Sequence, residues 1–293
     1  MITGDRRFLP GHPRYDLMRS AVDDLQVVYW GRGSFWPKLP QGAYDVVTAQ
    51  DPFWRGLFGW YAAKRLGAKL NVQVHADLDS VSATKHILMQ IVLRHADSVR
   101  VVSQNLKAQA GKLAPKTKVG VLPVYVDLER YRAIVREPHD GKVVLWLGRF
   151  EDEKDPLLAV EVFKKLHAQG SHASFVMLGA GSLQRDLEKA AADFPVSFPG
   201  WHDPLPYLAQ ADVVLCTSKF ESWGASVVEA LAAGVPVVSP DVGVAREAGA
   251  IVVSRELMPG AVVEALRSGM RGTLKLELLS GPEWAQHWRT TLV

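Results

Sequence analysis

The sequence predicts an α/β protein built from parallel sheets with helices on both faces. Short apolar runs alternate with amphipathic segments along a chain of 293 residues. Most of the apolar runs are continuous, as in strands that are covered on both faces. The order strand–helix–strand then implies right-handed crossovers and a parallel sheet. The length suffices for two ordinary α/β domains or one large one.

The first half of the chain contains the first of these sheets. We expect strands at 25–30, 44–50, 69–75, 98–103 and 118–123, and helices at 55–67 and 83–96. In the second helix Ile87, Ile91 and His95 share one stripe, with Leu88 and Val92 beside it, which is the spacing of a helix. Only Met1 to Thr3 precede Gly4, so the first strand is minimal or absent. We therefore expect an abbreviated N-terminal domain.

A domain boundary is expected where the sequence becomes polar and rich in turn residues, at 136–142. Such composition is typical of linkers between domains. We therefore predict an N-terminal domain at 1–137 and a C-terminal domain at 138–293.

Composition limits the class of partner and the compartment. The net charge of +3 is too small to argue for a nucleic-acid partner. No apolar run approaches the roughly 20 residues that span a bilayer, and the first residues lack the apolar segment of a signal peptide. We expect a cytoplasmic protein. Basic residues gather at Arg6, Arg7 and Arg14 and again at Lys64, Arg65 and Lys69. They suggest either a solvated face or peripheral contact with an anionic inner membrane surface.

Cys216 is the only cysteine, so no internal disulfide and no cysteine-based zinc site can form. It lies in the apolar run VVLCTS, which favours a buried structural thiol over a nucleophile.

The second half opens with a strand at 143–148, a charged loop at 149–155 and a helix. Asp155 is a candidate N-cap, and Pro156 suits the first helical position. The loop carries Arg149 and Lys154 between a strand's carboxyl end and a helix start. Two cations there can bind a diphosphate. The alternative is a solvated turn in which three acidic residues neutralise them, namely Glu151, Asp152 and Glu153.

The segment 218–240 is predicted to be a strand end, a glycine turn, a helix and a new strand. Gly224, Ala225 and Ser226 begin the helix, where unpaired N–H groups and the helix dipole favour a phosphate. Glu229 follows roughly one and a half turns later and can accept both hydroxyls of a ribose. Glu221, before the turn, can reach the hydroxyls of a sugar. The alternative for each glutamate is a solvent-exposed side chain.

Two further positions carry weaker signals. His75 follows an apolar strand, and ligands of open α/β sheets bind beyond the carboxyl ends of the strands. Asp77 and Asp79 form a D-x-D pattern that some sugar transferases use for a divalent cation. We expect cationic side chains to meet the phosphate charge instead, and so no metal. A base could lie near Phe198 to Trp201, where Trp201 is equally suited to packing.

These motifs resemble glycosyltransferase family 4, a group of retaining enzymes with the GT-B architecture. The resemblance is carried by FESWGASVVEALAAGVPVVSP with Glu221 and Glu229, by Leu147 to Phe150 with Lys154, and by QDPF and VQVHAD in the first half. It is strong over about 140–255 and moderate over 44–130. Many members have glycine after the first glutamate, where this chain has Ser222.

The resemblance implies two Rossmann-like domains that face each other across a cleft, with the nucleotide mainly on the second. It implies that Arg149 and Lys154 neutralise the diphosphate and that Glu229 holds the ribose. It also implies that Glu221 and His75 contact the donor sugar. The segment 281–288 resembles a closing helix, expected at about 282–291, that crosses back to the first domain.

The implied function is transfer of a hexose, with retention, from a nucleoside diphosphate sugar to an acceptor hydroxyl. The acceptor is a sugar, a lipid-linked molecule or a small molecule, and no separate cofactor is expected. One alternative is a non-catalytic nucleotide-sugar binder that lost its acceptor machinery. A second is an NAD-type dehydrogenase, which predicts a G-x-G-x-x-G run that the sequence lacks.

Overall fold

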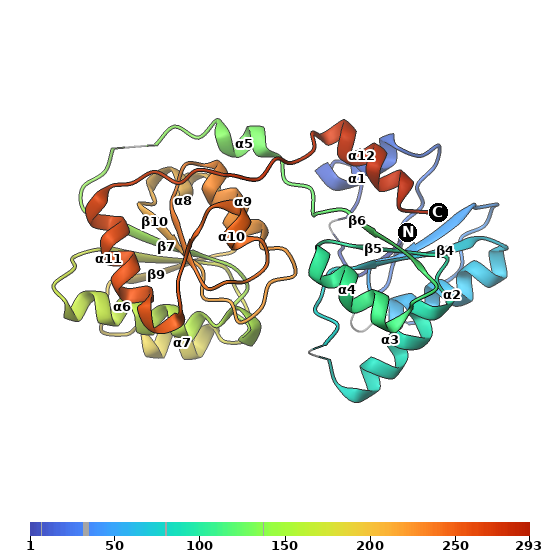
Figure 1. Ribbon diagram of the computed structural model, residues 1–293, viewed down its shortest axis with the longest axis horizontal. Helices are drawn as coiled ribbons and strands as arrows, with labels where there is room; N and C mark the ends of the chain where they lie inside the picture. The colour runs from blue at the N-terminus through green and yellow to red at the C-terminus, as the bar shows by residue number, and fades with distance from the viewer. Residues whose placement is uncertain (7, 32–34, 80, 137) are drawn as a thin grey trace. The chain divides into compact units, whose positions relative to one another are not determined.

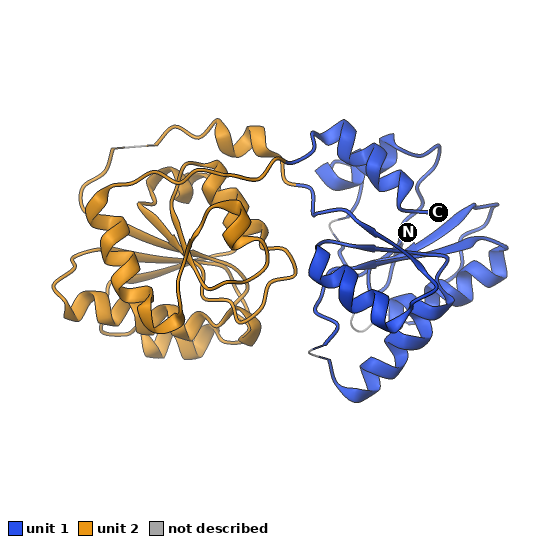
Figure 2. Cartoon of the chain, in the orientation of Figure 1, with its two compact units in different colours: residues 1–125, 278–293 blue, residues 126–277 orange. Residues whose placement is uncertain are grey.

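A computed structural model describes residues 1–6, 8–31, 35–79, 81–136 and 138–293. The chain forms two compact units, residues 1–125 with 278–293, and residues 126–277 (Figures 1 and 2). The division therefore lies before the boundary expected at 137/138; residue 137 is itself outside the described residues. The reason is a short helix after residue 126 that packs on a helix of the second unit.

Unit 1 contains a parallel sheet with helices on its faces (Figure 1). Within the described residues the sheet has six strands in the order β2-β1-β3-β4-β5-β6. The strands are β1 (Ile2–Thr3), β2 (Val28–Tyr29), β3 (Val46–Ala49), β4 (Lys69–Val74), β5 (Ser98–Val101) and β6 (Lys118–Val121). The helices are α1 (Pro13–Ser20), α2 (Trp54–Leu66), α3 (Ala83–His95), α4 (Gln104–Leu113) and α12 (Gly281–Thr290). The expected minimal first strand is present as β1, between β2 and β3.

Unit 2 repeats this plan. Its described strands form a second six-stranded parallel sheet, in the order β12-β11-β10-β7-β8-β9. The strands are β7 (Val143–Leu147), β8 (Ser174–Leu178), β9 (Val196–Gly200), β10 (Val213–Leu215), β11 (Val237–Ser239) and β12 (Ile251–Val252). The α-helices are α5 (Leu128–Arg132), α6 (Pro156–Ala168), α7 (Gln184–Ala190), α8 (Leu205–Gln210), α9 (Ala225–Ala232), α10 (Ala245–Ala248) and α11 (Met258–Ser268). Short 3₁₀ turns lie at Asp152–Lys154 and Arg255–Leu257. The prediction of two Rossmann-like α/β domains is confirmed.

The central strands of both sheets are buried on both faces, as their continuous apolar runs predicted. In unit 2 the expected inner face of α6 is buried, with Ala159, Phe163 and Leu166 each at most 1% exposed. The rings of Phe163 and Phe175 stack with centroids 4.9 Å apart. These contacts fix α6, and so the loop that precedes it, against β7 and β8.

The helix expected at 83–96 is present as α3, and its packed face lies beside the stripe of Ile87 and Ile91. Those two side chains are exposed, whereas Met89, Val92 and Leu93 are fully buried. Val92 contacts α2 at Gly56, where a Cβ would come within 2.6 Å of the Val92 Cγ1. The glycine lets the two helices approach closely, and that approach turns the other stripe of α3 inward.

The last helix, α12, packs in the core of unit 1. Ser280 and Glu283 form a capping box, in which the Ser280 amide donates to Glu283 Oε2 at 2.9 Å. Trp284 and Trp288 are buried with Met18 and Leu122. Since α12 follows unit 2 in the sequence, the chain returns to unit 1 at its end, as the resemblance implied.

Candidate functional site

The candidate site lies at the carboxyl edge of the unit 2 sheet, where the loop at 148–155 joins β7 to α6. The turn that follows β8, residues 179–182 with the sequence GAGS, packs directly on this loop. The Phe150 amide donates to the Ala180 carbonyl at 3.0 Å, and a Cβ on Gly181 would come within 2.4 Å of the Phe150 carbonyl oxygen. The glycines of this turn therefore serve a close backbone approach that fixes the start of the loop.

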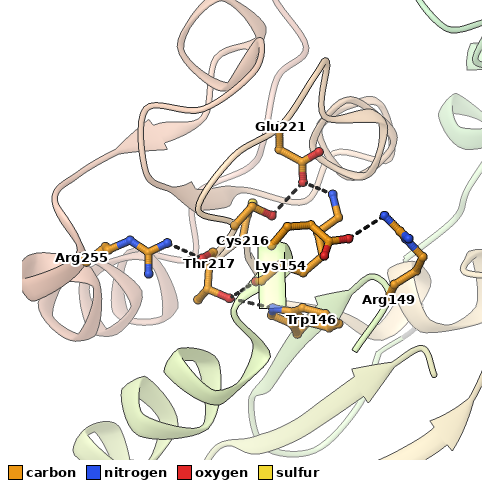
Figure 3. Close-up of polar contacts among 9 residues, drawn as sticks. Trp146, Arg149, Lys154, Cys216, Thr217, Glu221 and Arg255 are labelled. Carbon is orange, nitrogen blue, oxygen red and sulfur yellow. Dashed lines mark hydrogen bonds and ion pairs between the residues drawn. The ribbon is translucent and has the colours of Figure 1, made fainter. Parts of the chain in front are cut away.

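Lys154 and Glu221, two of the predicted site residues, are in direct contact. Lys154 Nζ donates to Glu221 Oε1 at 2.5 Å, and Ser218 Oγ donates to the same oxygen at 2.7 Å (Figure 3). The side chains are only 20% and 9% exposed, respectively. A charge-assisted contact shielded from water is stronger than a surface pair. The structure thus brings together two residues that lie far apart in the sequence.

The turn that carries Lys154 is held by residues that the sequence did not identify. Thr217 Oγ1 lies 3.0 Å from the Lys154 carbonyl oxygen and 2.8 Å from that of Asp155. The same hydroxyl accepts a hydrogen bond from Trp146 Nε1 at 3.0 Å. Arg255 Nη1 pairs with Asp155 Oδ2 at 2.6 Å, and its Nη2 donates to the Thr217 carbonyl at 2.8 Å. Figure 3 shows Thr217 between the Lys154 turn and Arg255.

Asp155 does not cap α6 with its side chain, contrary to the expectation. Its backbone has φ +46°, the one non-glycine residue with positive φ in the described part of the chain. Aspartate tolerates this left-handed conformation better than most residues. The carboxylate is directed to Arg255 instead, which explains why it is not available as a cap. Pro156 does occupy the first turn of α6, as expected.

Arg149 is held differently from Lys154. Its guanidinium is 62% exposed and pairs with Glu153 at 2.6 Å. Glu151 accepts hydrogen bonds from Ser182, and Asp152 pairs with Lys219. The alternative of a solvated, neutralised turn therefore describes Arg149, whereas Lys154 pairs with Glu221 outside the loop.

The turn before α9 has the geometry expected of a phosphate site. Gly224 is the N-cap with φ +97°, a conformation that favours glycine. Its carbonyl accepts the amides of Val227 and Val228, at 3.1 and 3.4 Å. The amides of Ala225 and Ser226 open the helix, and amides at this position have no intrahelical acceptor. The four residues from Gly224 to Val227 thus combine a fixed turn with the positive end of a helix dipole.

Glu229, on α9, is partly buried on the helix that packs against α5. Tyr131, on α5, is 7% exposed. Burial raises the pKa of Glu229 to about 6, although Tyr131 and the charge of Arg130 oppose the increase. The alternative of a solvent-exposed glutamate does not fit. No sequence signal identifies Tyr131, because nothing in the pattern of 126–137 links it to position 229.

His75 directly follows β4 in unit 1, at the carboxyl edge of that sheet. Burial is the main cause that lowers its pKa to about 3, and the charges of Arg100 and Arg14 contribute to the same decrease. The imidazole is therefore neutral at physiological pH and can donate or accept hydrogen bonds.

The D-x-D pattern after His75 is part of the local structure. Asp77 Oδ1 accepts hydrogen bonds from Gln109 Nε2 at 2.8 Å and from the Asp79 amide at 3.4 Å. Across the described residues, no group of three or more His, Cys, Asp or Glu side chains gathers as a metal site.

The remaining positions named from the sequence are Cys216, Phe198 and Trp201, and they differ in burial. Cys216 is buried, and burial raises the pKa of its thiol, with the Glu221 charge as the second cause. Phe198 packs edge-on against Phe150 with ring centroids 6.2 Å apart, whereas Trp201 is 57% exposed.

Comparisons with known proteins agree with this geometry. Residues 141–271 match the family model described as glycosyl transferases group 1. The chain is 29% identical over 277 residues to the 2-deoxystreptamine glucosyltransferase of Streptomyces kanamyceticus, covering 81% of this chain and 71% of that protein. It is 30% identical over 169 residues to the GDP-mannose-dependent alpha-(1-6)-phosphatidylinositol dimannoside mannosyltransferase of Mycobacterium tuberculosis strain H37Ra. That match covers 52% of this chain and 44% of the relative.

Solved structures share the fold. Anabaena Alr3699/HepE, solved in complex with UDP and glucose, superposes with a TM-score of 0.66 at 16% sequence identity. The superposition covers 85% of this chain and 74% of the Anabaena chain. The family match falls on the unit that carries Lys154, Glu221 and Glu229. Together, the family model over 141–271, the relatives and the shared fold support a glycosyltransferase of the GT-B fold.

Proposed function

We propose that this chain transfers a hexose from a nucleoside diphosphate sugar to an acceptor hydroxyl, with retention of the anomeric configuration. The observation that carries the proposal is the grouping at one sheet edge of the Lys154–Glu221 pair and the α9 N-terminus. A shielded cation and free backbone amides stabilise the negative charge of a leaving diphosphate. A carboxylate beside them can accept sugar hydroxyls.

The proposed roles follow these positions. Lys154, Arg149 and the amides after Gly224 bind the diphosphate, and Glu229 accepts the ribose hydroxyls. Glu221 contacts the donor sugar. His75 is a further contact to that sugar, on the family resemblance and on its neutral state near pH 7.

The reaction exchanges one bond at the anomeric carbon. The bond from that carbon to the diphosphate oxygen breaks, and the electron pair leaves with the nucleoside diphosphate. The acceptor oxygen bonds to the same carbon and its proton passes to the departing diphosphate. Glu221 already accepts hydrogen bonds from Lys154 and Ser218 on one oxygen, which favours an orienting role over that of a nucleophile.

A panel of nucleotide sugars tests the proposal. We expect one donor to be consumed with release of its nucleoside diphosphate, and NMR of the product to report the donor's anomeric configuration. An inverted product would contradict retention. If nucleotides raise the melting temperature but no donor is consumed with any acceptor, the non-catalytic binder is the correct description.

We propose that the transfer needs no divalent metal, because Lys154 and Arg149 supply cationic charge for the diphosphate. Activity should persist after dialysis against EDTA. Loss of activity with EDTA and its return with Mg²⁺ or Mn²⁺ would revive a metal role, with Asp77 and Asp79 as the first residues to substitute.

We also propose peripheral contact with anionic lipid through the outer face of α2 and α3. Trp54 and Ile87 are 63% and 60% exposed there, and basic side chains lie among the apolar ones. Lys64 Nζ lies 4.3 Å from the Trp60 ring centroid, and Lys85 Nζ lies 5.7 Å from that of Phe53. Aromatic and basic side chains together favour a membrane interface. In the described part of the chain, no helix has the length and apolar character to cross a bilayer.

Sedimentation with vesicles tests this contact. Binding should require an anionic phospholipid, fall as salt rises, and weaken when Lys64 and Lys85 are changed to glutamate. Equal binding to neutral vesicles, or none to either, would exclude it. A lipid acceptor could then be sought among membrane-embedded substrates.

A further inference from the structure

The backbone turn that carries Lys154 has a strained conformation. A 3₁₀ turn ends at Lys154, and Asp155 follows with φ +46°. A left-handed conformation at a residue other than glycine persists only where the surrounding contacts impose it. Strain of this kind is concentrated at functional sites. The contacts that impose the turn therefore indicate which residues the site depends on.

One buried hydroxyl group, that of Thr217, contacts both carbonyls of this turn. Thr217 lies two residues after β10 and is fully buried. Its Oγ1 lies 2.8 Å from the Asp155 carbonyl oxygen and 3.0 Å from that of Lys154. A hydroxyl has a single proton, so the two carbonyls share it. The same oxygen accepts the indole N–H of Trp146 in β7 at 3.0 Å, which fixes the orientation of the hydroxyl (Figure 3).

Arg255 connects the side chain of the turn to the backbone of Thr217. Its Nη1 pairs with Asp155 Oδ2 at 2.6 Å, and its Nη2 donates to the Thr217 carbonyl at 2.8 Å. The backbone of Asp155 is thus held directly by Thr217, and its carboxylate is held through Arg255. Two independent sets of contacts converge on Thr217, which explains how the left-handed conformation persists.

The turn determines where the Lys154 side chain begins, and so where its ammonium group can reach. Lys154 Nζ lies 2.5 Å from Glu221 Oε1, in a position where the lysine side chain is 20% exposed. A lysine is a compact charge on a flexible stem. If the turn relaxed, the stem would leave the backbone in another direction and the ammonium group would lose this position. A fixed turn therefore preorganises the cation and lowers the cost of binding an anion.

We propose that Thr217 is a positioning residue of the donor site, whose hydroxyl holds the strained turn so that Lys154 meets the diphosphate of the donor. The inference rests on the proposed function, in which Lys154 binds that diphosphate. Thr217 is fully buried, so it acts on the donor through the lysine and not by contact. Its effect on nucleotide affinity should therefore vanish when the lysine is absent.

Thr217→Val tests the proposal, because it removes the hydroxyl and keeps the branched shape. Binding of UDP and GDP is measured by calorimetry, and the affinity for the nucleotide that binds should fall about 5- to 10-fold. Thr217→Ser keeps the hydroxyl and should bind within about twofold of the wild type. Added to Lys154→Ala, Thr217→Val should change nothing further. Wild-type affinity in Thr217→Val, or an equal further loss in Lys154→Ala, would overturn the proposal.

Thr48→Val is the matched control for a general loss of stability. Thr48 is 4% exposed in unit 1, and its hydroxyl also donates one hydrogen bond and accepts one. The partners are Asn71 Oδ1 at 2.7 Å and Gln73 Nε2 at 2.9 Å. This variant should lower the melting temperature and leave nucleotide affinity unchanged. If it weakened nucleotide binding as much as Thr217→Val, destabilisation would explain both variants and the positioning role would be wrong.

Lysine labelling separates this inference from the proposed function. The rate at which acetic anhydride acetylates Lys154 is measured by mass spectrometry without nucleotide, with Lys164, paired with Glu161, as the internal reference. The rate should rise in Thr217→Val, because the ammonium group leaves its shielded pair, and return to the wild-type value in Thr217→Ser. An unchanged rate in Thr217→Val overturns the inference even if nucleotides bind. A raised rate, in a protein whose wild type binds no nucleoside diphosphate, would leave the role of Thr217 in the turn intact and refute the nucleotide site itself.

Discussion

The carboxyl edges of the two sheets each hold a cation that is shielded from water, in different ways. In unit 2, Lys154 is paired with the carboxylate of Glu221. In unit 1, Arg100 is 2% exposed and donates to neutral acceptors, namely the Gln73 side chain and the carbonyls of Leu122 and Pro123. Its guanidinium also lies 5.2 Å from the Trp284 ring centroid. The unit 2 edge pairs its cation with an anion. The unit 1 edge surrounds its cation with neutral polar groups and an aromatic ring.

This difference indicates which edge can exchange partners. A phosphate can replace Glu221 as the partner of Lys154 without leaving a charge alone, because both pairings join opposite charges. The acceptors of Arg100 are fixed parts of the sheet edge and of the segment after β6, so their loss would leave buried polar groups unpaired. The charge of Arg100 also helps to keep the neighbouring His75 neutral. Unit 1 therefore has a rigid edge and unit 2 an edge suited to an anionic ligand.

Substitution of Arg100 should have the largest effect of the variants considered, and the quantity it changes is the stability of the fold. We expect Arg100→Met to lower the free energy of unfolding by about 3 kcal/mol, since it leaves Gln73 and two carbonyls without their donor. Nucleotide affinity should be unchanged. Denaturant unfolding and calorimetry measure the two quantities, and Arg267→Met, at a 78% exposed position, is the control. If Arg100→Met lost nucleotide binding but kept its stability, the assignment of a rigid edge to unit 1 and a ligand edge to unit 2 would be wrong.

The same variant should alter the response to acid. The folded pKa of His75, about 3, lies below the usual 6.5. The unfolded chain therefore binds a proton that the folded chain does not, and stability falls as pH decreases from about 6.5 toward 3. Arg100→Met removes one cause of the depression, so the pKa of His75 should rise and this loss should shrink. NMR titration of the His75 ring measures the change.

Lys154→Ala should have the next largest effect, and the quantity it changes is the affinity for the donor. It removes a cation from the proposed diphosphate site and leaves Glu221 shielded without its partner. We expect donor affinity to fall about 10- to 100-fold, the equivalent of about 1.5–3 kcal/mol. Lys164→Ala is the control, because Lys164 is also paired, with Glu161 on the same unit. Wild-type affinity in Lys154→Ala would remove the lysine from the site.

The sequence predicted those parts of the site that depend on local pattern. Strand ends, the glycine turn at Gly224 and the two glutamates could be recognised because each lies in a short segment with a regular spacing. The inner face of α3 could not be predicted from the spacing of its residues, because the close approach allowed by Gly56 is a contact between helices. Tyr131 and Arg255 were missed for the same reason, as each meets its partner across about 100 residues of chain.

Arg255 offers a smaller test of the unit 2 edge, through the turn that carries Lys154. We expect Arg255→Met to raise the donor KM about fivefold with little change in kcat, because the turn loses a charge-assisted contact but Lys154 keeps its charge. Arg255→Lys should recover part of the loss, since a lysine can still pair with Asp155. A fall in kcat at constant KM would instead indicate a contact made in the transition state.

Glu153→Gln should have the smallest effect, and its size sharpens the contrast within the loop. The Arg149–Glu153 pair is exposed, and such pairs contribute about 0.2–1 kcal/mol. Its loss should change the free energy of unfolding by less than about 0.5 kcal/mol. It also frees Arg149 for a phosphate, so donor affinity should rise slightly at low salt and match the wild type at high salt. A stability loss as large as that of Arg100→Met would mean that the solvated pair, rather than the buried contacts of Thr217 and Arg255, holds the loop in place.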